Sequence, residues 1–258
     1  MIFLKLGGSL ITDKANAEHA RLDVIQRLAR EIYQAREANP QMELILGHGS
    51  GSFGHRPAQK YGTHKGAHSA EDWRGFSEVW AAANRLHRIV LDTLRELGLP
   101  AMSFPPSSSA ITVDGQIVEL AIEPIRTAVD KRLIPVIYGD VAFDRARGST
   151  IVSTEDILTH LARELHPERI LLAGKAPGVL SPSGDLLVEI DRQKLNEIQF
   201  HAPDGPDVTG GMEAKVYQAY NLAADMPDTE IIIFGAEEPD TLRDVLLGGI
   251  SGTRILSQ

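Results

Sequence analysis

Short, uniformly apolar runs alternate along this chain with longer segments of helical periodicity. Strands that helices cover on both faces require such uniform apolarity. The predicted strands are Ile2–Leu6, Glu43–Leu46, Ile134–Ile137, Ile170–Leu172 and Glu230–Phe234. The predicted helices lie near Leu22–Ala38, Trp73–Leu97, Pro124–Lys131, Thr154–Leu165, Gly211–Ala224 and Pro239–Leu246. This alternation predicts an α/β protein with a mostly parallel sheet and helices on both sides.

Two segments are predicted to be antiparallel insertions. Asp114-Gly115 lies between β-rich flanks in Ile111–Glu119, which is a strong hairpin pattern. Ser183-Gly184 takes the same place in Val179–Ile190. The chain has no internal repeat and no linker rich in Pro, Gly or Ser. We therefore expect residues 1–258 to form a single domain.

Composition narrows the class of protein. The 258 residues are 43% hydrophobic and 24% charged, as in ordinary globular proteins. The net charge of −9 argues against non-specific nucleic-acid binding and requires a local positive site for any anionic ligand. The absence of cysteine excludes disulfides and thiolate metal sites. No apolar stretch approaches the roughly 20 residues of a membrane span, and no signal-peptide pattern is seen, so a cytoplasmic location is expected.

Three motifs offer backbone amides to an anion. The first is Lys5-Leu6-Gly7-Gly8-Ser9 at the end of the first strand, where two glycines allow close backbone approach. By itself it is equally consistent with a tight turn and an incidental lysine. The second is Gly47-His48-Gly49-Ser50-Gly51-Ser52-Phe53-Gly54-His55, directly after a strand. Open α/β sheets bind ligands at such strand ends, so a ligand role is favoured here, with His55 as a side-chain donor.

The third motif, Asp207-Val208-Thr209-Gly210-Gly211-Met212-Glu213-Ala214-Lys215, reads as a loop that becomes a helix. A capped helix with Thr209 as N-cap and a solvated Lys215 explains part of it but not the paired glycines. A fourth segment, Ser153-Thr154-Glu155-Asp156, starts another helix. Its capping chemistry alone needs no functional explanation.

Together the motifs favour phosphoryl transfer, which depends on positioning and positive charge rather than on covalent chemistry. Lys5, Lys14 and Lys215 supply the charge, and an aspartate such as Asp156 would keep the lysines apart and oriented. The chain has neither a Walker-type Gly-x-x-x-x-Gly-Lys-Ser/Thr motif nor protein-kinase motifs.

The same residues resemble a known family. The amino acid kinase superfamily has motifs similar to three of these: Lys-x-Gly-Gly-Ser, the second glycine loop and Thr-Gly-Gly-Met-x-x-Lys. The similarity extends to Gly252-Thr253-Arg254-Ile255. Ile11-Thr12-Asp13-Lys14 and the Gly-Ser-Phe-Gly-His run resemble its isopentenyl phosphate kinase branch. The resemblance implies a three-layer α/β/α sandwich and conversion of isopentenyl phosphate to the diphosphate with ATP and Mg²⁺. It also implies a homodimer, with the acceptor bound by the N-terminal part and ATP by the C-terminal part.

The resemblance implies roles for individual residues. Lys5, Lys14, His55, Asp156 and Lys215 would be catalytic, with Asp156 orienting the lysines. ATP would be bound by a set comprising Lys5, Gly7, Gly8, Ser9, Lys175, Gly178, Gly210, Gly211 and Lys215. The substrate site would include Gly49, Gly51, Gly54, His55 and Gly139. Gly49 and Gly51 would line the gap between donor and acceptor, and Gly54 and His55 would bind the acceptor phosphate. Asp140 fits the pattern without an assigned role.

One segment departs from the family pattern. Many relatives have a Thr-Asp-Val-Asp-Gly-Val-Tyr-like stretch where this chain has Leu172-Ala173-Gly174-Lys175-Ala176-Pro177-Gly178-Val179-Leu180. The preference for the nucleotide base is therefore open. Lys175 is as consistent with solvent exposure as with contact to ATP phosphates.

The apolar tail of the acceptor would need a pocket beside the phosphate site. Phe76, Val79, Trp80 and Ala83 follow helical spacing and define one face of a helix. Such a face is usually core, although its first turns can also line a pocket. Two alternatives remain: a fosfomycin kinase-like enzyme acting on a small phosphonate, and a non-catalytic sensor of nucleotides or phosphometabolites.

Overall fold

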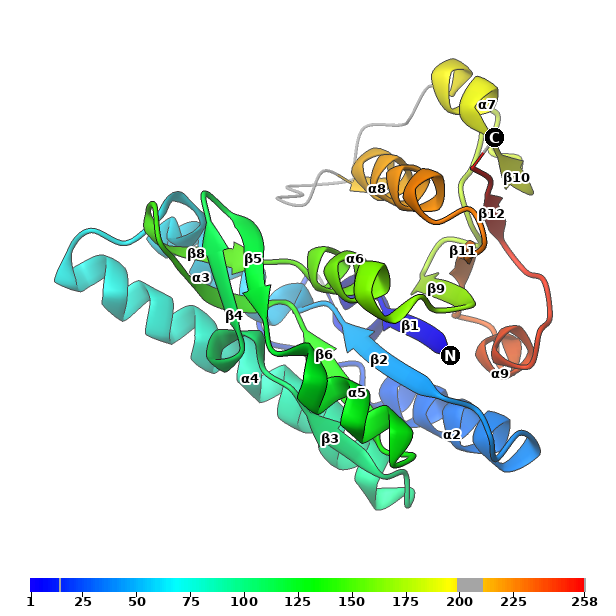
Figure 1. The fold of residues 1–258 in the computed structure, drawn as a ribbon, viewed down its shortest axis with the longest axis horizontal. Helices are drawn as coiled ribbons and strands as arrows, with labels where there is room; N and C mark the ends of the chain where they lie inside the picture. Colours follow the sequence, from blue (N-terminus) through cyan, green and yellow to red (C-terminus); the bar gives the residue numbers. More distant parts are fainter. Residues whose placement is uncertain (14, 199–210, 258) are drawn as a thin grey trace.

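The computed structural model describes residues 1–13, 15–198 and 211–257 (Figure 1). Its larger sheet has eight strands in the order β10-β12-β11-β9-β1-β2-β6-β3. Neighbours run parallel, except that β12 is antiparallel to β11. The strands are β1 (Ile2–Leu6), β2 (Leu44–His48), β3 (Ala101–Ser103), β6 (Ile134–Tyr138), β9 (Arg169–Gly174), β10 (Glu189–Ile190), β11 (Glu230–Gly235) and β12 (Thr253–Ile255).

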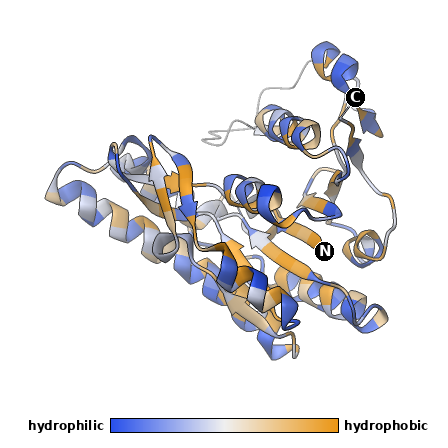
Figure 2. Cartoon of the chain, viewed as in Figure 1, coloured by the Kyte–Doolittle hydropathy of each residue, from blue (hydrophilic) through white to orange (hydrophobic). Residues whose placement is uncertain are grey.

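Alternating side chains of these strands enter two separate cores. Leu4 packs in one core with residues of α2 (Leu22–Ala38), α4 (Ala70–Glu96) and α9 (Thr241–Leu246). Phe3 packs in the other with residues of α5 (Ile122–Asp130), α6 (Thr154–Leu165) and α8 (Gly211–Asp225). Figure 2 shows the hydrophobic sheet between helices that carry polar residues on their outer faces. The fold is therefore a three-layer α/β/α sandwich, as predicted.

A smaller sheet of four strands, in the order β5-β4-β7-β8, lies near α3 and the first turns of α4 (Figure 1). Its strands are β4 (Ala110–Val113), β5 (Gln116–Leu120), β7 (Asp140–Asp144) and β8 (Gly148–Val152), and α3 is Gly51–Tyr61. The short elements are α1 (Gly8–Ile11), α7 (Arg192–Glu197) and the 3₁₀ turns Thr63–Lys65 and Pro106–Ser108.

The predicted helices and the five predicted strands are confirmed, with shifts at their ends. The Asp114-Gly115 hairpin is also confirmed: β4 and β5 pair antiparallel, and both turn residues have positive φ. The second predicted hairpin is confirmed over residues 179–187: Leu180 and Leu186 form an antiparallel bridge, and the amides of Ser181 and Leu187 donate to the carbonyls of Asp185 and Val179. Residues 189–190 lie beyond this hairpin and form β10, which pairs in parallel with β12.

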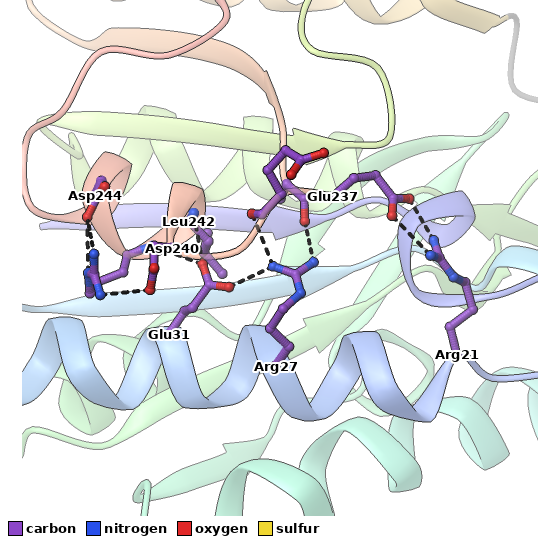
Figure 3. A network of polar contacts seen from close by, with 10 residues as sticks. Arg21, Arg27, Glu31, Glu237, Asp240, Leu242 and Asp244 are labelled. Atoms are coloured by element: carbon purple, nitrogen blue, oxygen red, sulfur yellow. Dashed lines mark hydrogen bonds and ion pairs between the residues drawn. The ribbon is translucent and has the colours of Figure 1, made fainter.

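A partly buried polar network fastens the C-terminal part of the sheet to α2 (Figure 3). Arg21 donates two hydrogen bonds to the Glu237 carboxylate, at 2.7 and 3.0 Å. Arg27 bridges Glu31, at 2.6 Å, and the Ala236 carbonyl, at 2.6 Å. Glu31 also accepts the Leu242 amide of α9, at 3.0 Å. The network fixes the turn after β11 against α2.

None of the helices in the described part of the chain combines the length and apolarity that a bilayer crossing requires.

Candidate active site

Two glycine turns meet backbone to backbone at the carboxyl ends of β1 and β2. A Cβ on Gly8 would lie 2.6 Å from the Gly51 amide nitrogen, and a Cβ on Gly49 would lie 2.8 Å from that of Gly8. Thr12 links the turns, because its hydroxyl donates to the Gly8 carbonyl at 2.7 Å and accepts the Ser52 amide at 3.0 Å. Only glycine fits at this contact, which explains the two glycine motifs found in the sequence.

Two cavities lie on either side of this contact. The first, of about 350 Å³, extends from Gly7 to the end of β9 and to α8, and we call it the β9-side cavity. The second, of about 560 Å³, extends from Gly8 to α3, α4 and β8, and we call it the α3-side cavity. Both are lined by the same five residues, Lys5, Ser9, Glu155, Lys215 and Gln218. The cavities therefore meet at two lysines and one carboxylate.

Glu155, and not Asp156, holds Lys5 in this position. The Lys5 ammonium forms an ion pair with the Glu155 carboxylate, and the two side chains are 8% and 19% exposed. Burial alone would raise the pKa of Glu155, but Lys5, through its charge and its hydrogen bond, together with the charge of Lys215, keeps that pKa below its ordinary value. The carboxylate therefore stays ionised between two cations.

Asp156 has a different position from the one expected. It forms a capping box with Ser153, whose hydroxyl accepts the Asp156 amide at 3.0 Å, and it accepts Gln218 Nε2 at 3.0 Å. Lys5 is therefore oriented by Glu155, one residue earlier, while an orienting role of Asp156 toward the other lysines stays a prediction. The family resemblance implied the aspartate, while the first-turn glutamate has no separate sequence signal.

The α3-side cavity is arranged for an anion. Gly49, Gly51, Gly54, His55 and Gly139 line it, so the structure brings together the residues predicted to bind the acceptor phosphate. The first residues of α3 and α6 also line it, and a helix N-terminus offers unpaired amides and positive potential. His55 and Lys5 thus face the same space.

The deeper wall of the α3-side cavity is apolar in part. Ala58, Val79, Ala83 and Ile151 line it. Phe76 packs against Ala58 and Val79 in a small cluster behind this wall. Trp80 is 41% exposed and is not among the lining residues, so its assignment to the tail pocket is wrong. Trp80 directly follows Val79, so it is turned by about 100° around α4 and leaves the face that Val79 and Ala83 share.

The β9-side cavity combines polar and apolar walls. Gly7, Ser9, Lys175 and Lys215 line it, and Leu158, Leu172 and Phe234 are among its apolar residues. Gly8 lines the α3-side cavity, and Gly211 begins α8 with φ +66°. Gly178 is not among the lining residues: a Cβ there would lie 2.7 Å from the Thr253 hydroxyl, so this glycine serves close packing. Lys14 and Gly210 lie outside the described residues.

The sequence and structure both have relatives of known type. The family model described as "Amino acid kinase family" matches residues 1–235. Isopentenyl phosphate kinase of Methanocaldococcus jannaschii is 32% identical and that of Methanothermobacter thermautotrophicus 35% identical, each over 99% of this chain and 98% of the relative.

An isopentenyl phosphate kinase solved by X-ray crystallography superposes with a TM-score of 0.82 at 32% identity, over 99% of both chains. Carbamate kinase from Giardia lamblia, bound to AMP-PNP, shares the fold alone, with a TM-score of 0.73 at 15% identity. The chain therefore belongs to the amino acid kinase family, in the branch of the isopentenyl phosphate kinases.

Proposed function

We propose that this enzyme transfers the γ-phosphoryl group of ATP to isopentenyl phosphate and forms isopentenyl diphosphate. The observation that carries the proposal is the meeting of the two cavities at Lys5, Ser9 and Lys215. Two anions bound there lie end to end, with the transferring group between them. The relatives' names supply the identity of the acceptor.

ATP is placed in the β9-side cavity and the acceptor in the α3-side cavity. This assigns the C-terminal part of the domain to the nucleotide and the N-terminal part to the acceptor. Lys5 and Lys215 line both cavities and neutralise the γ-phosphoryl group as it moves. Lys14 is proposed to join them. The Glu155 carboxylate fixes Lys5 and remains ionised, so it takes no proton from the acceptor.

The acceptor phosphate is bound by His55, by the Gly54 amide and by the N-termini of α3 and α6. Its oxygen attacks the γ-phosphorus in line and directly, without a covalent enzyme intermediate. A phosphate monoester is already ionised near neutral pH, so the step needs no general base. The five-carbon tail points toward Val79, Ala83 and Ile151, which present the apolar part of the wall.

Mg²⁺ is proposed to arrive with ATP. Among residues 1–13, 15–198 and 211–257 no three His, Cys, Asp or Glu side chains are grouped to hold a metal ion. This fits an ion held chiefly by phosphate oxygens and water, which is the usual arrangement for Mg²⁺ at nucleotide sites. The ion would supply further neutralisation of the phosphates. A cytoplasmic homodimer is proposed from the family relationship, and analytical ultracentrifugation measures the oligomeric state.

A coupled assay of ADP release tests the proposal. Purified enzyme with ATP and Mg²⁺ is given isopentenyl phosphate, dimethylallyl phosphate or fosfomycin as acceptor. We expect the highest kcat/KM with isopentenyl phosphate and little turnover of fosfomycin, because that acceptor has no extended apolar tail. Preference for fosfomycin would replace the proposal with a phosphonate kinase. Nucleotide binding without turnover of any acceptor would indicate a sensor.

A further inference from the structure

Two buried histidines lie behind the acceptor loop, away from the cavity that His55 lines. His48, the last residue of β2, is fully buried, and His87 of α4 is 3% exposed. His48 Nε2 lies 3.0 Å from His87 Nδ1, and His87 Nε2 lies 2.7 Å from the Ser103 hydroxyl on β3. Both rings stack on Tyr138 of β6. Two strands, β2 and β3, and one helix, α4, thus contribute to one series of hydrogen-bonded side chains, and β6 supplies the ring that packs against it.

This series of hydrogen bonds ends at the backbone of the glycine loop that follows β2. His48 Nδ1 lies 3.1 Å from the Gly49 carbonyl oxygen, which can only accept a hydrogen bond. Nδ1 must therefore carry the proton, and in a neutral ring Nε2 must then accept from His87 Nδ1–H. His87 Nε2 in turn accepts from the Ser103 hydroxyl. One arrangement of protons satisfies every contact with both rings neutral.

The surroundings keep both rings neutral. Burial lowers the pKa of His48 to about 4, and the nearby charge of Lys5 lowers it further, although the Gly49 contact opposes this. Burial also lowers the pKa of His87 to about 2, with smaller contributions from His48 and Arg88. Neither ring gains a proton near neutral pH, so each hydrogen bond keeps the same donor and the same acceptor.

The Gly49 carbonyl fixes the plane of the Gly49–Ser50 peptide. In a trans peptide the C=O and N–H point in opposite directions, so the Ser50 N–H points away from the buried His48 ring. Gly49 and Ser50 both line the α3-side cavity. We propose that Ser103, His87 and His48 form a one-directional hydrogen-bond relay that positions the Gly49–Ser50 peptide, so that its N–H binds the acceptor phosphate. His48 and His87 are then positioning residues that never touch substrate.

The proposal rests on the proposed function for the identity of the acceptor, but the proton arrangement does not depend on it. Two-bond ¹H–¹⁵N correlation spectra of the full-length ¹⁵N-histidine-labelled protein at pH 7 report the tautomer of each ring. Loss of one cross-peak set in His48→Asn, and of another in His87→Asn, assigns the two rings. We expect both as neutral Nδ1–H tautomers. An Nε2–H tautomer at His48 would overturn the relay, whatever the substrate is.

A pair of substitutions at His87 separates positioning from packing. His87→Leu fills the space but removes the donor, whereas His87→Asn packs less well but keeps an N–H near the place of Nδ1. We expect kcat/KM for isopentenyl phosphate to fall about ten- to a hundred-fold in His87→Leu, with KM for ATP unchanged within about twofold. His87→Asn should recover most of the acceptor kinetics, although its thermal midpoint is lower.

A simple structural role makes the opposite prediction, since activity would then follow the thermal midpoint of the two variants. Acceptor kinetics in His87→Leu equal to those of the wild type would also overturn the relay. If the wild-type enzyme does not phosphorylate isopentenyl phosphate at all, the proposed function fails. The tautomer spectra then still decide the relay.

Discussion

Lys5 and Glu155 form a shielded ion pair although 150 positions separate them in the chain. Lys5 belongs to β1, and Glu155 to the first turn of α6, so the pair exists only once the sheet and the helix have packed together. Both residues line both cavities, so Glu155 holds the Lys5 ammonium where the two cavities meet.

Glu155→Gln should therefore reduce turnover more than nucleotide binding. The amide keeps the size of the side chain but removes the charge that orients Lys5. We expect kcat to fall about ten- to a hundred-fold, with KM for ATP changed by less than about threefold. Steady-state kinetics and a thermal melt provide the measurement.

Asp156→Asn is the matched control, since it alters the neighbouring residue with the same chemistry. This change keeps an acceptor for the Ser153 amide but removes a negative charge at the N-terminus of α6, so it should lower the free energy of unfolding by about 0.3–1 kcal/mol. It should leave kcat closer to the wild-type value than Glu155→Gln does. If Asp156→Asn proves the more damaging for kcat, the correction from Asp156 to Glu155 is wrong.

His55→Ala should nearly abolish use of the acceptor. His55 lines the α3-side cavity opposite Lys5, and removal of one donor to a reacting anion typically costs about 10²–10³ in kcat. The β9-side cavity is not lined by His55, so ATP affinity should be retained. Isothermal titration calorimetry with a non-hydrolysable ATP analogue measures whether the nucleotide affinity is retained. Turnover within tenfold of the wild type would exclude a direct role for the histidine.

The length of the acceptor tail should depend on Val79 and not on Trp80. Val79 is 3% exposed and lines the cavity, whereas the Trp80 side chain is 41% exposed. Val79→Ala should raise the rate with geranyl phosphate relative to isopentenyl phosphate by about tenfold, because a methylene-sized gain of apolar space discriminates at about that level. Trp80→Ala should leave the ratio unchanged. Equal shifts in both variants would show that the tail lies elsewhere.

The sequence predicts the layers of this fold better than it predicts the contacts within the site. Uniform apolarity at Ile2–Leu6 and periodicity at Leu22–Ala38 define elements whose observed bounds are the same, because burial of a whole face leaves a pattern in the chain. The smaller sheet was foreseen only at its Asp114-Gly115 turn. Strands such as β7 and β8 are as long as β1, but each contains polar residues, so no uniformly apolar run marks them in the sequence.

Within the site, the glycine motifs were predictable because close backbone contact permits no other residue. The choice between Glu155 and Asp156 was not, since adjacent residues in the first turn of a helix point in directions that depend on how the helix packs. The relay from Ser103 to Gly49 was also beyond sequence reasoning, because its members come from β3, α4 and β2.

Acid should weaken the smaller sheet through Asp144. This buried carboxylate accepts the Thr112 hydroxyl at 2.8 Å and the amides of Gly115, Ala146 and Arg147 at 2.7–2.9 Å. Burial alone would raise the pKa of Asp144, but these hydrogen bonds outweigh it and hold the pKa well below its ordinary value. The carboxylate therefore stabilises the fold fully above about pH 4, the unfolded pKa, and loses that contribution as the pH falls further.

Asp144→Asn should lower the free energy of unfolding at pH 7 by about 1–3 kcal/mol, because some of the donors around the side chain lose their acceptor. Between pH 5 and pH 3 the gap between wild type and variant should narrow by about 1 kcal/mol, because the unfolded wild-type chain takes up a proton at this position in that range while the folded protein stays ionised. Urea denaturation at pH 7, 5 and 3 measures both quantities. A gap that stays constant over this range would show that Asp144 does not titrate with the depressed pKa its hydrogen bonds imply.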